Sequence, residues 1–192
     1  MPLTIGLTGG IAAGKSEALA AFGRLGAATL SSDAVVHELL DSEPLRGRLV
    51  ERWGAGVAPG DVVDRAKIGE IVFADPEQLT WLEQQVHPLV GERIAAWLTG
   101  LPAEDDVAVI EVPLLFESGM EGVFDTTVAI VTADEVRRER AAARGHALVD
   151  EREARQMLQD EKAARAAHAI VNDGSVEDLE RALSALLAKL RE

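Results

Sequence analysis

The sequence predicts an α/β protein with a central parallel sheet of about five strands and helices on both faces of that sheet. Three observations predict this three-layer fold. Short apolar segments alternate with amphipathic stretches along most of the chain. The short segments are continuous apolar runs, which is typical of strands buried on both faces. A glycine-rich turn joins the first such segment to the first helical stretch.

The expected strands are short β-branched or apolar runs bounded by glycine or polar residues. They cover residues 3–8, 27–30, 107–112, 124–131 and 168–171. Helices are expected where large apolar residues recur at intervals of three and four positions. These stretches begin at about 15, 33, 133, 150 and 176, and the fourth runs to 167. Ser175 is expected to cap the last helix, with Asp178 completing a capping box.

Residues 41–100 differ from the rest because they contain three helical patterns and no convincing strand. The third pattern includes His87-Pro88, and a proline is expected to kink or break a helix because it lacks a backbone N–H. The sequence therefore predicts a single domain over 1–192 in which 41–100 forms a helical insertion.

Composition excludes several classes of protein. The net charge of −14 disfavours broad binding to nucleic acid, because an acidic surface repels phosphate backbones. No apolar run approaches the roughly 20 residues that cross a bilayer, so no membrane span is expected. The absence of cysteine excludes disulfides and thiolate metal sites. We expect a cytoplasmic protein, because the N-terminus lacks a basic segment followed by a cleavage site, and a monomer, with a weak oligomer as the alternative.

The glycine-rich turn matches the motif G-x-x-x-x-G-K-[ST] completely. It consists of Gly9, Gly10, Ile11, Ala12, Ala13, Gly14, Lys15 and Ser16. Such a turn points backbone N–H groups and a helix N-terminus at phosphate oxygens. Lys15 adds a charge at the β- and γ-phosphates, and the Ser16 hydroxyl can hold Mg²⁺. The motif therefore predicts a nucleoside triphosphate site.

The rest of the chain favours a small-molecule kinase among the proteins with this loop. The chain has one asparagine, Asn172, and no lysine follows it, so the guanine-reading N-K-x-D motif of switch GTPases is absent. We expect 1–40, 101–135 and 168–192 to form the nucleotide-binding core, 41–100 to bind the acceptor, and 136–167 to close as a lid. A nucleoside or sugar kinase and a nucleotide-binding module without turnover remain alternatives.

Basic residues concentrate in the expected lid. Two interpretations stay open: a site for a small polyanion, or a solvated helix whose charges pair with glutamates of the same stretch. The basic residues are Arg137, Arg138, Arg140, Arg144, Arg152, Arg155, Lys162 and Arg165.

A few residues are candidates for the acceptor side, each with a structural alternative. Asp33 follows the second strand, which we expect beside the phosphate-binding loop, and it either aligns the acceptor hydroxyl or caps a helix. Glu111 is either an acid near Mg²⁺ or an ordinary strand-end residue. Pro113 and Phe116 either wall a pocket or pack in the core. His87 is either a contact to the acceptor or a solvated side chain.

These motifs together resemble the dephospho-coenzyme A kinase family over essentially the whole chain. The resemblance rests on Thr8 to Ser16, on Asp33, on His87-Pro88-Leu89, on Pro113-Leu114-Leu115-Phe116-Glu117, on Arg140, on Arg152 to Met157, and on Ile170, Asn172 and Gly174. It implies transfer of the γ-phosphoryl group of ATP to the ribose 3′-hydroxyl of dephospho-CoA, with Mg²⁺.

The resemblance also implies roles for individual residues. Lys15 and Ser16 would hold phosphate and metal, Asp33 would be the base, and Arg140 the lid arginine. Adenine would lie near Asn172 and Gly174, and the acceptor near His87, Pro113, Leu114, Phe116 and Glu117. Three positions depart from the family pattern: Ser31 replaces an aspartate, Ala12-Ala13 replaces Gly-Ser, and the loop from Arg144 to Arg152 is about three residues short.

Overall fold

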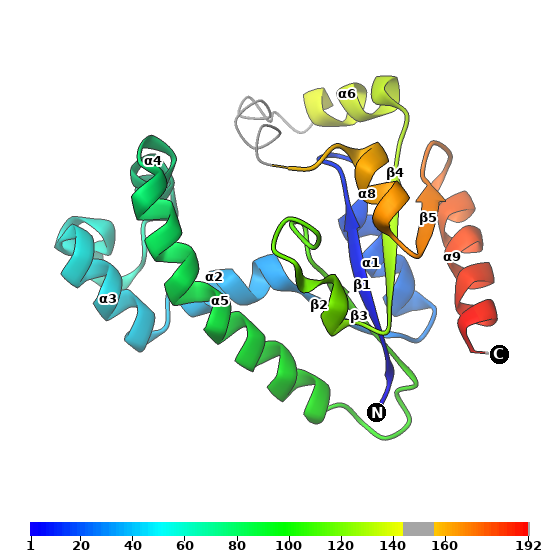
Figure 1. Cartoon of the computed structure of the whole chain (residues 1–192), viewed down its shortest axis with the longest axis horizontal. Coiled ribbons are helices and arrows are strands. Elements are labelled where there is room, and N and C mark those ends of the chain that lie inside the picture. Colours follow the sequence, from blue (N-terminus) through cyan, green and yellow to red (C-terminus); the bar gives the residue numbers. More distant parts are fainter. Residues whose placement is uncertain (144–155, 192) are drawn as a thin grey trace. The chain divides into compact units, whose positions relative to one another are not determined.

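The computed structural model describes residues 1–143 and 156–191 (Figure 1). The chain divides into two compact units. The first comprises Met1–Ser31 and Leu101–Glu192, and the second comprises Ser32–Gly100. In the part of the chain that the structure describes, no helix is both long and apolar enough to cross a membrane.

A parallel sheet of five strands forms the centre of the first unit, which confirms the predicted fold class. The strands are β1 (Leu3–Gly9), β2 (Ala28–Ser31), β3 (Val107–Glu111), β4 (Thr126–Val131) and β5 (His168–Val171). Their order in the sheet is β2-β3-β1-β4-β5. β3 returns from the long connection after β2 and pairs with both β2 and β1, so it lies between these two strands.

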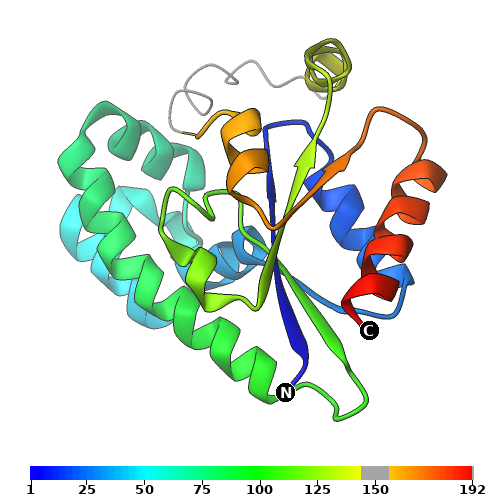
Figure 2. The same cartoon turned by 45° about the vertical axis from the view of Figure 1, so that its right-hand side comes forward.

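The helices α1 (Lys15–Arg24), α8 (Gln159–Arg165) and α9 (Val176–Leu190) pack against this sheet. The first unit also contains α6 (Asp134–Ala143), which follows β4, and a short 3-10 helix, η3 (Met120–Val123). Figure 2 shows α1 and α9 on one face of the sheet and α8 on the other. The core between the sheet, α1 and α9 includes Ile5, Leu7, Phe22, Leu183 and Leu187, which are at most 1% exposed.

The ends of two helices test the expected boundaries. The capping box of α9 is confirmed, since Ser175 Oγ accepts from Asp178 N at 3.2 Å and Asp178 Oδ2 accepts from Ser175 N at 3.1 Å. The helix expected over 150–167 is confirmed only in its last part. Residues 156–158 are not helical, α8 begins at Gln159, and residues 150–155 lie outside the described residues.

The second unit is helical, as predicted for this part of the chain. It contains α2 (Ser32–Leu40), α3 (Glu43–Trp53), η1 (Ala55–Val57), η2 (Pro59–Asp61), α4 (Arg65–Ala74) and α5 (Pro76–Thr99). The predicted break at Pro88 is wrong, because α5 continues through this residue. A proline removes one hydrogen bond, and the apolar contacts of Val86, Val90 and Ile94 outweigh that loss. All three tryptophans of the chain lie in this unit, and the rings of Trp53 and Trp81 pack edge to face at 5.1 Å.

Candidate nucleotide-binding site

The glycine-rich loop lies where the motif predicted it, between the end of β1 at Gly9 and the start of α1 at Lys15. Three of its residues have positive φ angles: Gly9 at 155°, Ala12 at 60° and Gly14 at 96°. A Cβ atom on Gly14 would lie 2.2 Å from Asn172 Nδ2, so this position admits no side chain without a rearrangement. The loop therefore follows a tight path that glycine makes possible.

The side chains at the start of α1 face the loop and solvent. Lys15 Nζ donates to the carbonyl oxygens of Gly9 at 3.2 Å and Gly10 at 2.9 Å, which holds the ammonium over the loop. Ser16 lies in the first helical turn with an exposed side chain. A cation and a helix N-terminus at one loop form a favourable environment for phosphate.

Three residues from later in the chain support the loop. Asn172 Nδ2 and Thr132 Oγ1 both donate to Ala13 O, at 2.8 and 2.9 Å. Arg140 donates in turn to Asn172 O at 2.9 Å. Asn172 is only 6% exposed, and Thr132 is 2% exposed. The ends of β4 and β5 and one residue of α6 thus fix the conformation of the loop.

Thr132 supports the loop, and sequence reasoning missed it. It follows β4 with no motif around it, so no local signal identifies it. Gln159 of α8 was missed for the same reason. Its side-chain amide makes two hydrogen bonds to the backbone of Thr132. It accepts from Thr132 N at 3.2 Å and donates to Thr132 O at 2.8 Å.

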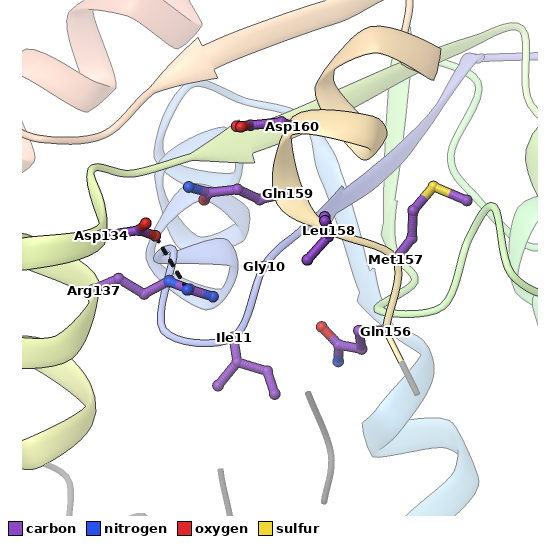
Figure 3. Close-up of a pocket in the computed structure, with 9 residues that line it drawn as sticks. All are labelled: Gly10, Ile11, Asp134, Arg137, Gln156, Met157, Leu158, Gln159 and Asp160. Atoms are coloured by element: carbon purple, nitrogen blue, oxygen red, sulfur yellow. Dashed lines mark ion pairs between the residues drawn. The ribbon is translucent and has the colours of Figure 1, made fainter. Parts of the chain in front are cut away.

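A cavity of about 260 Å³ opens beside the loop, within the first unit. Figure 3 shows the residues that line it, which come from the loop, from α6, from the segment before α8 and from the first turn of α8. They are Gly10, Ile11, Asp134, Arg137, Gln156, Met157, Leu158, Gln159 and Asp160. Arg137 pairs with Asp134 at 3.1 Å. A guanidinium and two amide side chains next to the loop are groups that bind phosphate oxygens.

The segment 113–117 lies in the same unit, and its side chains have different surroundings. Phe116 is buried at 4% exposure, and the guanidinium of Arg165 stacks on its ring at 4.8 Å. Leu114 is exposed. Glu117 pairs with the buried Lys162 at 3.0 Å.

The described part of the basic stretch bears on the second interpretation, in which its charges pair with glutamates of the same stretch. Lys162 and Arg165 form ion pairs with Glu117 and Glu121, which lie outside the stretch. The expectation of a solvated helix is wrong for Lys162, which is fully buried. Burial lowers the pKa of Lys162, and the hydrogen bond and charge of Glu117 oppose that change. Arg144, Arg152 and Arg155 lie outside the described residues.

Three further candidates lie elsewhere in the chain. Asp33 is the second residue of α2 and has an exposed side chain. His87 is exposed on α5. Glu111 ends β3 at 6% exposure, and in the sheet it is paired with Leu7 of β1 and with Ser31 of β2.

A family model for dephospho-CoA kinase matches residues 3–178 of this chain. The chain belongs to the dephospho-CoA kinase family. This confirms the predicted family and the P-loop kinase fold. A dephospho-CoA kinase from Agrobacterium fabrum is 36% identical over 194 aligned residues, which cover 99% of each chain.

Solved structures with similar folds cover nearly the whole chain. The crystal structure of TT1252 from Thermus thermophilus has a TM-score of 0.83 and 37% identity, with 98% of each chain covered. Dephospho-CoA kinase from Campylobacter jejuni has a TM-score of 0.73 and 26% identity, with 99% of this chain and 98% of the other covered.

Proposed function

We propose that this chain transfers the γ-phosphoryl group of ATP to the ribose 3′-hydroxyl of dephospho-CoA, which gives coenzyme A and ADP in the last step of coenzyme A biosynthesis. The observation that carries this proposal is a complete phosphate-binding loop in a chain that the family model matches over residues 3–178. The enzyme is an ATP-dependent phosphotransferase with an alcohol as acceptor.

On the nucleotide side, the backbone of residues 9–14 binds the phosphates, and Lys15 neutralises charge on the transferred group. Arg140 is the proposed lid arginine, and its hydrogen bond to Asn172 O supports a place beside the loop. Asn172 and Gly174, which follow β5, are proposed to border the adenine. The Asn172 amide donates a hydrogen bond to Ala13 O. Asn172 therefore also contributes to nucleotide binding by holding the loop in its conformation.

Mg²⁺ is the proposed metal, and it neutralises charge on the β- and γ-phosphates when bound. Among the described residues, no group of three or more His, Asp or Glu side chains forms a metal cluster. Mg²⁺ in a kinase keeps several waters and takes most of its remaining ligands from substrate phosphates. The exposed Ser16 hydroxyl would hold the ion. The candidate acid near the ion is Glu111, which ends β3, the strand next to β1.

On the acceptor side, Asp33 is the proposed group that accepts or aligns the ribose hydroxyl. Its exposed carboxylate follows the carboxyl end of β2 by two residues. The helical insertion 41–100, with His87, is proposed to bind the acceptor, together with Pro113, Leu114, Phe116 and Glu117. A loose transition state demands alignment more than basicity, and an ordinary aspartate supplies that.

The remaining assignments are also proposals. The regions 1–40, 101–135 and 168–192 form the nucleotide-binding core, and 136–167 forms the lid, of which the structure describes 136–143 and 156–167. We propose a cytoplasmic enzyme that acts as a monomer, with a weak oligomer as the alternative.

The deciding experiment is mass spectrometry of the product formed from ATP, Mg²⁺ and dephospho-CoA. The expected result is coenzyme A carrying the new phosphate on the ribose. Turnover of a nucleoside or a sugar, with none of dephospho-CoA, would overturn the proposal in favour of another P-loop kinase. Binding of ATP without turnover of any acceptor would favour a nucleotide-binding module.

Two variants test the roles of single residues. Lys15→Ala should lower ATP affinity or turnover by orders of magnitude, because the variant lacks the ammonium that neutralises charge on the transferred phosphate. Asp33→Asn should lower kcat by orders of magnitude and leave the Kd for ATP near the wild-type value. Glu38→Gln is a matched control, since Glu38 is an exposed carboxylate on the same helix that pairs with Arg93. An Asp33→Asn enzyme as active as the Glu38→Gln enzyme would refute the role of Asp33.

A further inference from the structure

A charged side chain is buried in the first unit away from the phosphate-binding loop. Lys162 of α8 is 0% exposed. Its Nζ atom donates to Pro113 O at 2.6 Å and lies 3.0 Å from Glu117 Oε1. A buried ammonium is costly unless it is paired and hydrogen-bonded, so its partners explain how the fold tolerates it.

The two partners of Lys162 also bind two other segments. Pro113 O accepts a second hydrogen bond from Thr8 Oγ1 at 3.3 Å, and Thr8 directly precedes the phosphate-binding loop. Glu117 Oε1 accepts a second hydrogen bond from Met157 N at 2.8 Å, and Met157 lines the cavity beside the loop. One ammonium therefore connects the end of β1, the segment 113–117 and the wall of the cavity.

The supports of the loop make no direct hydrogen bond to Lys162, and α8 reaches them through Gln159, whose side chain bonds the backbone of Thr132. Ala13 O is held by Asn172 and Thr132, and neither residue contacts Lys162 through a hydrogen bond that the structure gives. Loss of the Lys162 ammonium should therefore leave the loop able to bind phosphate. It should change where the cavity wall and the segment 113–117 lie relative to that loop.

We propose that Lys162 is a positioning residue for phosphoryl transfer, which holds the segment 113–117 and the cavity wall at 156–159 in place beside the phosphate-binding loop. The proposal rests on the proposed kinase function. A buried ion pair contributes little net stability compared with an apolar pair of the same volume, but it imposes a definite geometry. Displacement of a positioning group by about 1 Å costs roughly 100-fold in rate. An ion pair that fixes the positions of such groups therefore favours a high rate of phosphoryl transfer.

Three variants separate positioning from stability. Lys162→Met keeps the length of the side chain and removes the ammonium. The double variant Lys162→Met/Glu117→Gln also removes the carboxylate, so that no uncompensated charge is left buried. Residue 117 can still accept from Met157 N in the double variant, but nothing joins Pro113 O to α8. Arg191→Met is the control, because it removes a cation from an exposed ion pair with Asp106.

Each variant is measured for Tm, for kcat with ATP and dephospho-CoA, and for the Kd of a non-hydrolysable ATP analogue. We expect kcat of Lys162→Met to fall about 10- to 100-fold per folded enzyme, with Kd changed less than about threefold. In the double variant we expect Tm to recover and kcat to stay low. Arg191→Met should keep kcat within about twofold of wild type.

Two results would overturn the proposal: wild-type kcat per folded Lys162→Met enzyme, or a double variant that regains wild-type kcat together with its Tm. If Lys162→Met does not fold, kcat of the double variant is compared with that of Glu117→Gln alone, because Glu117 is itself a proposed acceptor contact. Failure of the kinase function itself is seen separately, because wild-type protein would then bind the analogue and leave dephospho-CoA unchanged.

Discussion

Gly14 allows a sharp test of the phosphate-binding loop, because its substitution by alanine has two separable costs. Its φ angle of 96° lies where side chains are strained, and this strain costs about 1–2 kcal/mol. A Cβ atom would also lie 2.2 Å from Asn172 Nδ2, so the amide has to move away from Ala13 O. Leaving that buried amide without its partner costs about 1–3 kcal/mol.

Gly14→Ala should therefore lower the free energy of unfolding by about 2–5 kcal/mol, a large part of the 5–15 kcal/mol typical of a folded domain. Urea denaturation followed by circular dichroism measures this loss, and calorimetry measures the affinity for an ATP analogue. The affinity should fall as well, because the support of the loop by Asn172 is disrupted. The double variant Gly14→Ala/Asn172→Ala should lose about 1–2 kcal/mol less than the sum of the single variants, since the steric conflict is absent from it.

Gly47→Ala is the control for this prediction. Gly47 lies inside α3, and a Cβ atom there would meet nothing within 4 Å. An alanine at such a position should stabilise the helix by about 0.5–1 kcal/mol. A Gly14→Ala protein with wild-type stability and wild-type affinity for the analogue would refute the reasoning about the loop.

Further predictions concern α9, α5 and the buried lysine. Ser175→Ala should lower the free energy of unfolding by about 1 kcal/mol, because α9 loses its N-terminal hydroxyl acceptor. Pro88→Ala should raise stability by up to about 3 kcal/mol, since alanine restores a backbone N–H and removes the ring from the interior of α5. Burial lowers the pKa of Lys162 from its usual value of 10.5, so the unfolded chain binds more protons between the lowered value and 10.5. The stability of wild type relative to Lys162→Met should therefore increase as pH rises through that window in urea titrations.

Each of these predictions has an opposite result that would contradict it. A Ser175→Ala protein with unchanged stability would show that the capping box does not hold α9. A destabilised Pro88→Ala protein would mean that the proline ring makes necessary contacts. A relative stability that falls or stays constant with rising pH would contradict the lowered pKa of Lys162.

Local features of the fold were predictable from the sequence because the information for them is local. The phosphate-binding loop is contained in eight consecutive residues, from Gly9 to Ser16. Each strand of the sheet is a short apolar run, and Ser175 caps α9 through a residue three positions away. Periodicity also identified the helices of residues 41–100. The break predicted at Pro88 was wrong because the loss of one hydrogen bond does not interrupt a helix of 24 residues.

Features that depend on distant contacts were not predictable in the same way. Asn172 Nδ2 and Ala13 O are 159 residues apart in sequence, and the hydroxyl of Thr132 reaches the same oxygen from 119 residues away. The order of the strands depends on where each connection returns to the sheet. The apolar run of a single strand does not contain this information. The charge of Lys162 indicated a solvated residue, and only its pairing with Glu117 explains its burial.

The placement of the tryptophans has a practical consequence for spectroscopy. The chain contains no tyrosine, and its three tryptophans all lie between residues 53 and 97. Intrinsic fluorescence excited at long ultraviolet wavelengths therefore reports on the helical unit alone, without engineered dyes. A change in emission when only nucleotide is added would show that nucleotide binding at the glycine-rich loop alters the surroundings of the tryptophans in the helical unit.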